Sequence, residues 1–455
     1  MEFEKVSPPN PEQEKSKELI PIVEGLVFHE SGSFLKEEDF LTSSDMGLVP
    51  NDLARPVILE TAVPPERKKG NKNAPMEAKS VLSSGKGCFV EHPINVSGVN
   101  FNFVQWKGVG GSSKVVKESL PKLSTKITEI PNPLSSETDF PLSHVDSGDL
   151  SLDLITGGEY VLNMKDAQEK SNLARQKGIR TPLTMAWFKF SRSFAEKQGL
   201  PLPNNDDPHD TEGEDSEEWE KRLREAGLNT DFKISKKGSN ILGQEIRVFR
   251  NVFRLLDLSE TLKNTNETEK HSQVSAIIKS SRVILEKEFD RKMTNEEFVY
   301  LYTELLAKQA TLLVRERIIF HSIAQFNQNI TLAAEIVDWN YVSFVESESQ
   351  SEDNLKIYKQ LFTFCGYLKS ISEAITLIDN TEINDSKVVD SFLEKIQEEL
   401  PDSNWQEFKK ILSEDKDFSD LLQFTVPGTP WEQDFKKYQE YADLFAERIL
   451  ADKAS

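Results

Sequence analysis

The chain has 455 residues, of which 37% are hydrophobic, and a formal net charge of −21. This is longer than a compact domain of usual size, and the hydrophobic content is sufficient for a buried core. The negative charge argues against nonspecific binding to nucleic acid or to anionic membranes. Any phosphate ligand therefore has to meet a local cluster of cations.

Cysteine usage and the N-terminal sequence bear on the compartment. The two cysteines, Cys88 and Cys365, form neither a Cys-x-x-Cys pair nor the Cys/His spacing of a zinc site. The N-terminus has no basic region followed by an apolar run, and no stretch reaches the roughly 18 apolar residues that a membrane span needs. We expect a cytoplasmic protein. A secreted effector without a cleaved signal would have the same features.

The first part of the chain is predicted to add little to the core. Residues 1–80 are rich in Pro, Ser, Glu and Lys, which predicts a largely disordered or loosely docked extension with at most one strand, at 20–28. Glycines and alternating apolar residues predict strands over 81–107. Residues 112–156 are rich in Ser, Pro and Lys without a sustained period, and they are predicted to form a long inserted loop.

Regular structure is predicted to return after this loop. A strand at 160–162 leads into a helix over about 165–176, which Gly178 ends as a C-terminal cap. A further strand follows at 184–190. With the earlier strands, these elements form one strand-rich unit over 81–192.

The segment 193–455 is predicted to be mainly helical. It begins with an acidic loop at 203–218, whose like charges favour a solvated excursion, and with a strand that carries arginines. From Gln273 onward, apolar residues recur with the i, i+3, i+4, i+7 spacing of helices. The one strand-like exception is 326–340, so the predicted fold class is α+β.

Lys107 is the first candidate site residue. It ends an apolar strand, where a cation reaches phosphates, and Gly108 and Gly110 after it permit close approach of the backbone to a ligand. A strand-end lysine that extends to solvent is the alternative. On the next helix, Glu169 or its neighbour Gln168 is a candidate partner for this lysine, as in the lysine–glutamate pair of protein kinases.

Asn329 and Asp338 are candidate metal ligands. They lie nine residues apart, at the two ends of a predicted short hairpin. Mg²⁺ is usually held by one or two protein oxygen ligands together with phosphate oxygens and water. The alternative is an asparagine in a turn and an aspartate that caps an element.

Arg247 and Arg254 are candidate phosphate ligands. They lie seven residues apart, on a predicted strand and just after it. Arginine offers planar, bidentate donors that match phosphate oxygens. Surface ion pairs are the alternative.

Taken in order, these motifs resemble the selenoprotein O family, also called the YdiU family. The matching stretches are FVQWKGVG, GGEYVLNM, GIRTPLTMA, IRVFRNVFRLLD and NQNITLAAEIVDWN. The family's lysine motif matches at Gln105, Lys107, Gly108 and Gly110. Its arginine strand matches at Arg247, Val248 and Arg254.

The resemblance implies a bilobal protein-kinase-like fold, with a strand-rich N-lobe and a mainly helical C-lobe. It implies transfer of AMP from ATP to Ser, Thr or Tyr hydroxyls of protein substrates, with Mg²⁺ or Mn²⁺. The nucleotide-binding residues that it implies are Lys107, Gly108, Gly110, Gly157, Gly158, Glu169, Arg247 and Arg254, and the metal ligands are Asn329 and Asp338.

Gln328 stands where the family has an acid. An amide cannot accept a proton, so a general base is lost at that position. The predicted function is a monomeric, ATP-dependent protein adenylyltransferase without nucleic-acid or membrane partners. The alternatives are a catalytically impaired nucleotide-binding pseudokinase that acts as a scaffold, and a helical interaction protein without a ligand.

Overall fold

The computed structural model describes most of the chain after residue 158 and shorter segments before it. The described residues are 32–34, 37–42, 56–59, 82–84, 87–108, 159–198, 200–225, 241–263, 265–320, 329–339, 342–345, 351–414 and 432–451.

These residues form mixed α and β structure. The strands are β1 (Gly32–Phe34), β2 (Phe40–Thr42), β3 (Val57–Leu59), β4 (Leu82–Ser84), β5 (Gly87–Val96), β6 (Val99–Lys107), β7 (Glu159–Tyr160), β8 (Leu183–Phe190), β9 (Leu242–Phe249), β10 (Ile318–Phe320) and β11 (Val342–Phe344). The helices are the 3-10 helix η2 (Glu37–Asp39), α4 (Val161–Gln176), α5 (Arg192–Gln198), α6 (Ser216–Glu225), α7 (Leu255–Leu262), α8 (Glu267–Glu288), α9 (Asn295–Arg315), α10 (Ser351–Asp379), α11 (Asp385–Glu399), α12 (Asp402–Glu414) and α14 (Glu432–Ala451).

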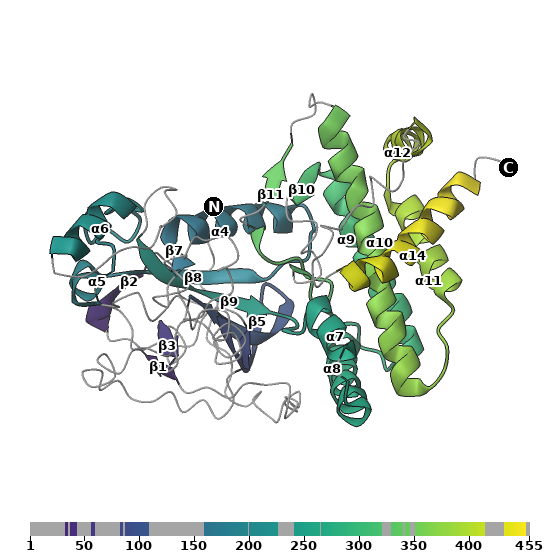
Figure 1. Cartoon of the computed structure of the whole chain (residues 1–455), viewed down its shortest axis with the longest axis horizontal. Coiled ribbons are helices and arrows are strands. Elements are labelled where there is room, and N and C mark those ends of the chain that lie inside the picture. The colour runs from purple at the N-terminus through teal and green to yellow at the C-terminus, as the bar shows by residue number, and fades with distance from the viewer. Residues whose placement is uncertain are drawn as a thin grey trace.

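The central element is an antiparallel sheet of seven strands in the order β2-β8-β9-β6-β5-β4, with β7 paired to β9. Figure 1 shows this sheet with α4 along one side, and the helices from α7 to α14 gathered beyond one end of it. The hairpin between β5 and β6 turns at Ser97 and Gly98, which both have positive φ, as a tight two-residue hairpin turn requires. The strands predicted over 81–107 and 184–190 are confirmed.

The N-terminal segment contributes more than a loose extension. Strand β2 pairs with β8, with Phe40 opposite Phe190, so the predicted 1–80 extension supplies an edge of the sheet. The strand proposed at 20–28 and the inserted loop at 112–156 lie outside the described residues.

Helix α4 begins earlier than its sequence predicts. It starts at Val161, so the strand predicted at 160–162 is wrong, and β7 ends at Tyr160. The predicted cap is confirmed, because Gly178 has φ 84 and its N–H donates to the carbonyl of Arg175 at 2.9 Å. Met164 of α4 lies against Gly243 of β9. This helix therefore covers the sheet face that carries the odd-numbered residues of β9.

The helical second half is confirmed, with one correction. Helix α9 begins with a capping box between Thr294 and Glu297. It ends at Arg315, and Arg317 has a positive φ of 53°. The chain then forms β10, which pairs with β11. The helix predicted to continue through 318–320 is therefore wrong, because a residue in the left-handed region ends the helical path.

A continuous apolar core joins the sheet to the helices. It includes Phe103 of β6, Phe249 of β9, Leu306 of α9, Leu368 of α10 and Phe445 of α14, all buried. In α10, the span Asp353–Asp379 is long and apolar enough to cross a membrane by length and composition alone, which differs from our sequence expectation. Core helices pass the same test, and 72% of its apolar window is buried inside the protein.

The acidic segment 203–218 is largely exposed to solvent, as predicted, but its backbone is anchored to the sheet. Lys189 of β8 is fully buried, and its ammonium group donates hydrogen bonds to the carbonyls of Asn205 and Asp210 at 3.0 Å and to that of Asp207. The loop therefore folds around an internal cation, and α6 begins within the predicted loop.

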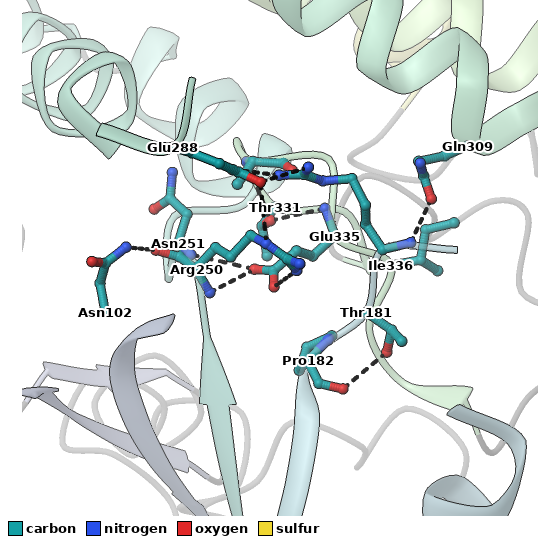
Figure 2. A network of polar contacts seen from close by, with 12 residues as sticks. Asn102, Thr181, Pro182, Arg250, Asn251, Glu288, Gln309, Thr331, Glu335 and Ile336 are labelled. Atoms are coloured by element: carbon teal, nitrogen blue, oxygen red, sulfur yellow. Dashed lines mark hydrogen bonds and ion pairs between the residues drawn. The ribbon is translucent and has the colours of Figure 1, made fainter. Parts of the chain in front are cut away.

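A buried carboxylate connects the sheet to residues 329–339, which we call the 329–339 loop (Figure 2). Glu335 is fully buried, and its Oε1 accepts from Arg250 Nη1 at 2.9 Å. Its Oε2 accepts from the backbone N–H groups of Arg250 and Asn251 at 3.0 and 3.3 Å. Burial raises the pKa of Glu335, and the cations Arg250 and Arg180 oppose that rise.

Arg180 extends this network to the helices. Its guanidinium forms a bidentate pair with Glu288 of α8, at 2.9 and 2.8 Å, and its Nε donates to the carbonyl of Ala333. Its backbone carbonyl accepts from Ile336 N–H at 2.8 Å. The loop that carries the candidate metal ligands is thus fixed against both the sheet and α8.

Candidate functional site

Strand register brings the candidate cations of the sheet to one face. Lys107 of β6 lies opposite Glu245 of β9, and Gln105 lies opposite Arg247. Successive side chains on a strand alternate between faces, so these four residues share a face. This is the face that α4 covers.

The 329–339 loop is a hairpin, as its sequence predicts. Ile330 forms a β-bridge with Ile336, and the carbonyl of Asn329 accepts from Val337 N–H at 2.8 Å. Asn329 is buried and lies beside the arm that ends at Asp338.

The same loop is paired to the chain just after β9. Thr331 forms a bridge with Arg254, and the carbonyl of Ile330 accepts from Leu255 N–H at 3.0 Å. Arg254 is therefore held beside the hairpin at the start of α7.

Asp338 is the point where the predicted residues meet. Its Oδ1 lies 3.8 Å from Lys107 Nζ and 3.7 Å from Arg247 Nη1, and its Oδ2 lies 3.8 Å from Arg254 Nη1. Its φ is 60°, in the left-handed region that aspartate adopts more readily than most residues. Strained backbone of this kind is concentrated at functional sites.

Two further carboxylates contact Lys107. Its Nζ lies 3.5 Å from Glu159 Oε2 and 3.7 Å from Glu245 Oε1. Burial lowers the pKa of Lys107, but the Glu159 carboxylate, with Asp338 and Glu245, outweighs burial and the repulsion of Arg247. The net effect is a raised pKa, so Lys107 is a cation at neutral pH. We call Lys107, Glu159, Glu245, Arg247, Arg254 and Asp338 the Lys107 cluster.

Glu169 is not the partner of Lys107. Its side chain is exposed on α4, and Glu159, just before the first turn of that helix, contacts the lysine instead. The prediction placed the carboxylate on the helix by analogy with kinases. The structure supplies it from β7, where pairing with β9 places Glu159 opposite Gly243.

The Lys107 cluster is balanced in charge and partly open to solvent. It holds three cations and three carboxylates. The side chains of Glu159, Glu245 and Arg247 are at most 7% exposed, whereas those of Lys107, Arg254 and Asp338 are 16%, 17% and 24% exposed. Solvent therefore reaches the last three side chains, and Arg247 lies within 3.7 Å of the partly exposed Asp338 carboxylate.

Within the described residues, no group of three or more His, Cys, Asp or Glu side chains is arranged to hold a metal ion. The predicted ligands Asn329 and Asp338 are one amide and one carboxylate. This donor set fits a Mg²⁺ that takes its remaining oxygens from nucleotide and water. It does not fit a cation held by protein groups alone.

Among the predicted glycines, Gly108 is described. It is buried with φ 91, and its carbonyl accepts from Gln244 Nε2 at 2.9 Å, which is the left-handed backbone expected where glycine is required. The other predicted site residues Gly110, Gly157, Gly158 and Gln328 lie outside the described residues.

Sequence reasoning missed Glu159 and Glu245. Glu245 carried a signal, since a glutamate two residues before Arg247 in an apolar strand shares its face. Glu159 carried none, because its proximity to Lys107 depends on how β7 pairs with β9.

No family model matches this chain, and a search of curated proteins also gives no match. The resemblance to the selenoprotein O family therefore stays a prediction carried by the motifs quoted above.

Proposed function

We propose that the Lys107 cluster binds the phosphates of ATP with Mg²⁺ or Mn²⁺, and that the chain transfers AMP to protein hydroxyls. One observation carries the proposal: Lys107, Arg247 and Arg254, from three different segments, all lie within 4 Å of the carboxylate of Asp338. In an acidic protein, such a concentration of cations is where a polyphosphate binds.

The Asp338 carboxylate lies within 4 Å of all three cations, so a bound phosphate would take its position. Binding then becomes an exchange, in which phosphate oxygens replace Asp338 on the three cations and the metal replaces the cations on Asp338. Asn329, on the facing arm of the hairpin, would supply a second oxygen to the metal. The metal neutralises phosphate charge, and the protein residues position and orient the nucleotide.

The fold supports this proposal. Protein-kinase sites contain a strand lysine paired with a carboxylate, a helix after that strand, and, much later in the chain, an asparagine and an aspartate that bind the metal. This chain has candidate residues for each of these parts in the same order. We propose that the sheet with α4 and the helices from α7 onward correspond to the two lobes of such a fold. The resemblance to selenoprotein O implies that the α-phosphorus meets the attacking hydroxyl and that pyrophosphate leaves. The predicted cytoplasmic location and monomeric state belong to the same proposal.

The test uses ATP labelled at the α- or the γ-phosphate, with Mg²⁺ or Mn²⁺. We expect the α-label on the protein itself or on an added protein substrate, and no γ-label. Asp338→Ala should reduce the transfer by roughly 100-fold or more, since it removes a preorganised ligand of the charged reacting group. Asp290→Ala is the matched control, because Asp290 is an exposed aspartate that also has a positive φ, 48°. Transfer of the γ-label would overturn the proposal.

A nucleotide-binding scaffold without turnover is the second candidate. The charge balance of the Lys107 cluster favours it, because three carboxylates already neutralise the charge of the three cations, and Gln328 replaces an acid. ATP with Mg²⁺ would then raise the melting temperature without any transfer of label. A chain whose melting temperature changes with neither ATP nor metal would instead be an interaction protein without a ligand.

A further inference from the structure

Glu245 occupies a distinct position in the Lys107 cluster. It lies in the middle of β9, fully buried, directly opposite Lys107 in the neighbouring strand. Its Oε2 accepts from Thr184 Oγ1 of β8 at 3.3 Å. The side chain is therefore held between two neighbouring strands, and its carboxylate has little freedom to move.

One oxygen of Glu245 lies between two cations. Oε1 is 3.0 Å from Arg247 Nη2 and 3.7 Å from Lys107 Nζ. The two cations repel each other, and Arg247 lowers the pKa of Lys107. A buried anion between them offsets this repulsion, at a place where water cannot screen it.

The other two carboxylates cannot perform this role. Glu159 contacts Lys107 at 3.5 Å, and no ion pair joins it to Arg247 among the described residues. Asp338 contacts both cations, but it lies on the 329–339 loop and exchanges its partners when nucleotide and metal bind. Glu245 alone remains between the two cations once phosphate replaces Asp338.

The guanidinium of Arg247 has a hydrogen-bond donor available for a ligand. Its Nε and Gln105 Oε1, opposite it on β6, are both buried and have no hydrogen-bond partner within the described part of the chain. Buried polar atoms without partners are uncommon in native proteins and call for an explanation such as an absent ligand or water.

We propose that Glu245 is a positioning residue, which holds Lys107 and Arg247 side by side so that both cations reach the same phosphate group of the nucleotide. This inference rests on the proposed function. Glu245 does not touch the nucleotide itself. It acts by keeping two donors in a fixed arrangement before the ligand arrives, which lowers the cost of ordering them.

The test compares Glu245→Gln, Glu159→Gln and wild type at neutral pH for binding of ATP with Mg²⁺, and of adenosine, by calorimetry. Glutamine keeps the shape of the side chain and removes its charge. We expect Glu245→Gln to weaken binding roughly 10- to 100-fold, the usual effect of losing a residue that orients a ligand-binding group. Adenosine, which has no phosphate, should bind all three proteins alike, whereas a general disturbance of the site would weaken its binding too. Glu159→Gln should weaken ATP binding less than Glu245→Gln does.

Exposed Glu304 of α9 supplies the control Glu304→Gln, which should behave as wild type. Thr184→Val is a second variant, which keeps every charge and removes only the hydrogen bond to Glu245 Oε2. It tests the inference if Glu245→Gln does not fold. We expect it to weaken binding a few-fold. Wild-type protein that does not bind ATP would overturn the proposed function. Unchanged ATP affinity in folded Glu245→Gln, or in Thr184→Val when Glu245→Gln does not fold, would overturn this inference alone, and so would an equal loss of ATP and adenosine binding.

Discussion

At the scale of single residues, Asp338 determines how the proposed site responds to metal. Its carboxylate lies near three cations, and its backbone is in the left-handed region. An anion in this position competes with phosphate for the same donors. A metal ion that takes over the carboxylate removes the competition, so metal and nucleotide should bind cooperatively.

The first prediction follows from this competition. In Asp338→Ala, ATP without metal should bind about tenfold more tightly than in wild type, a difference of ~1.4 kcal/mol, and Mg²⁺ should no longer increase the affinity. Calorimetric titration with ATP, with Mg²⁺ or with EDTA, measures both effects. If Asp338→Ala instead binds metal-free ATP more weakly than wild type does, Asp338 is no competitor of phosphate.

Much of this residue set is accessible to prediction from sequence. Lys107, Arg247, Arg254 and Asp338 were all predicted, and the structure brings all four together. Glu245 and Glu159 could not be predicted with equal ease, because their contacts depend on cross-strand register, which a single sequence specifies weakly.

At the scale of elements, alternating and helical periodicity predicted the main strands and helices. The failures are short. Strands β10 and β11 have three residues each and no periodicity of their own, so an apolar run next to a long helix predicts more helix. The acidic loop is exposed as predicted, but its anchoring was not predicted, because composition does not reveal that Lys189 of β8 donates to its backbone carbonyls.

The second prediction concerns this loop. Lys189→Met keeps the length of the side chain but removes the donor of three partly buried hydrogen bonds to backbone carbonyls. The expected loss is about 2 kcal/mol of unfolding free energy, because hydrogen bonds to a charged group contribute about 1.5–3 kcal/mol and water can replace part of what the carbonyls lose. Urea denaturation measures it. Lys221→Met on neighbouring α6, whose side chain is 77% exposed, is the control and should change little. Equal stability of Lys189→Met and wild type would contradict an internal cation.

The third prediction concerns the contact between the ends of α4 and α9. Lys177 Nζ donates to Glu316 Oε2 at 2.6 Å. This hydrogen bond lowers the pKa of Glu316, burial opposes the effect, and Arg315 adds to it. A carboxylate whose folded-state pKa is lowered stabilises the protein above its unfolded pKa, and that contribution is lost as the pH falls through the folded value.

Wild type should therefore be more stable than Glu316→Gln at pH 6, and the difference should shrink between about pH 4.5 and pH 3. Urea denaturation of both proteins at several pH values measures it. A difference that stays constant or grows with acidification would contradict the ion pair.

At the scale of the whole molecule, the sheet and the helices are joined by a continuous core and by the Glu335 network. Arg250 follows β9, Glu335 lies in the 329–339 loop, and Glu288 ends α8. The network fixes the loop that carries Asp338 relative to the strand that carries Arg247. The geometry of the proposed site thus depends on contacts that contain none of its residues.

The last prediction compares the contribution of Glu335 to stability with that of a more exposed ion pair. Glu335→Gln removes the closer counter-ion of Arg250, at 2.9 Å, and leaves the more distant Glu288 at 3.5 Å, which should cost about 3 kcal/mol of unfolding free energy. Glu288→Gln is the comparison, because the side chain of Glu288 is 28% exposed and Arg250 keeps its closer partner Glu335, so about 1 kcal/mol or less is expected. The proposed function adds a second expectation, that Glu335→Gln also weakens ATP binding although it lies outside the Lys107 cluster. Urea denaturation and calorimetry test both effects. Equal costs for the two variants would mean that Glu335 is no more than one ion pair among many, and that the position of the 329–339 loop is set by the apolar core alone.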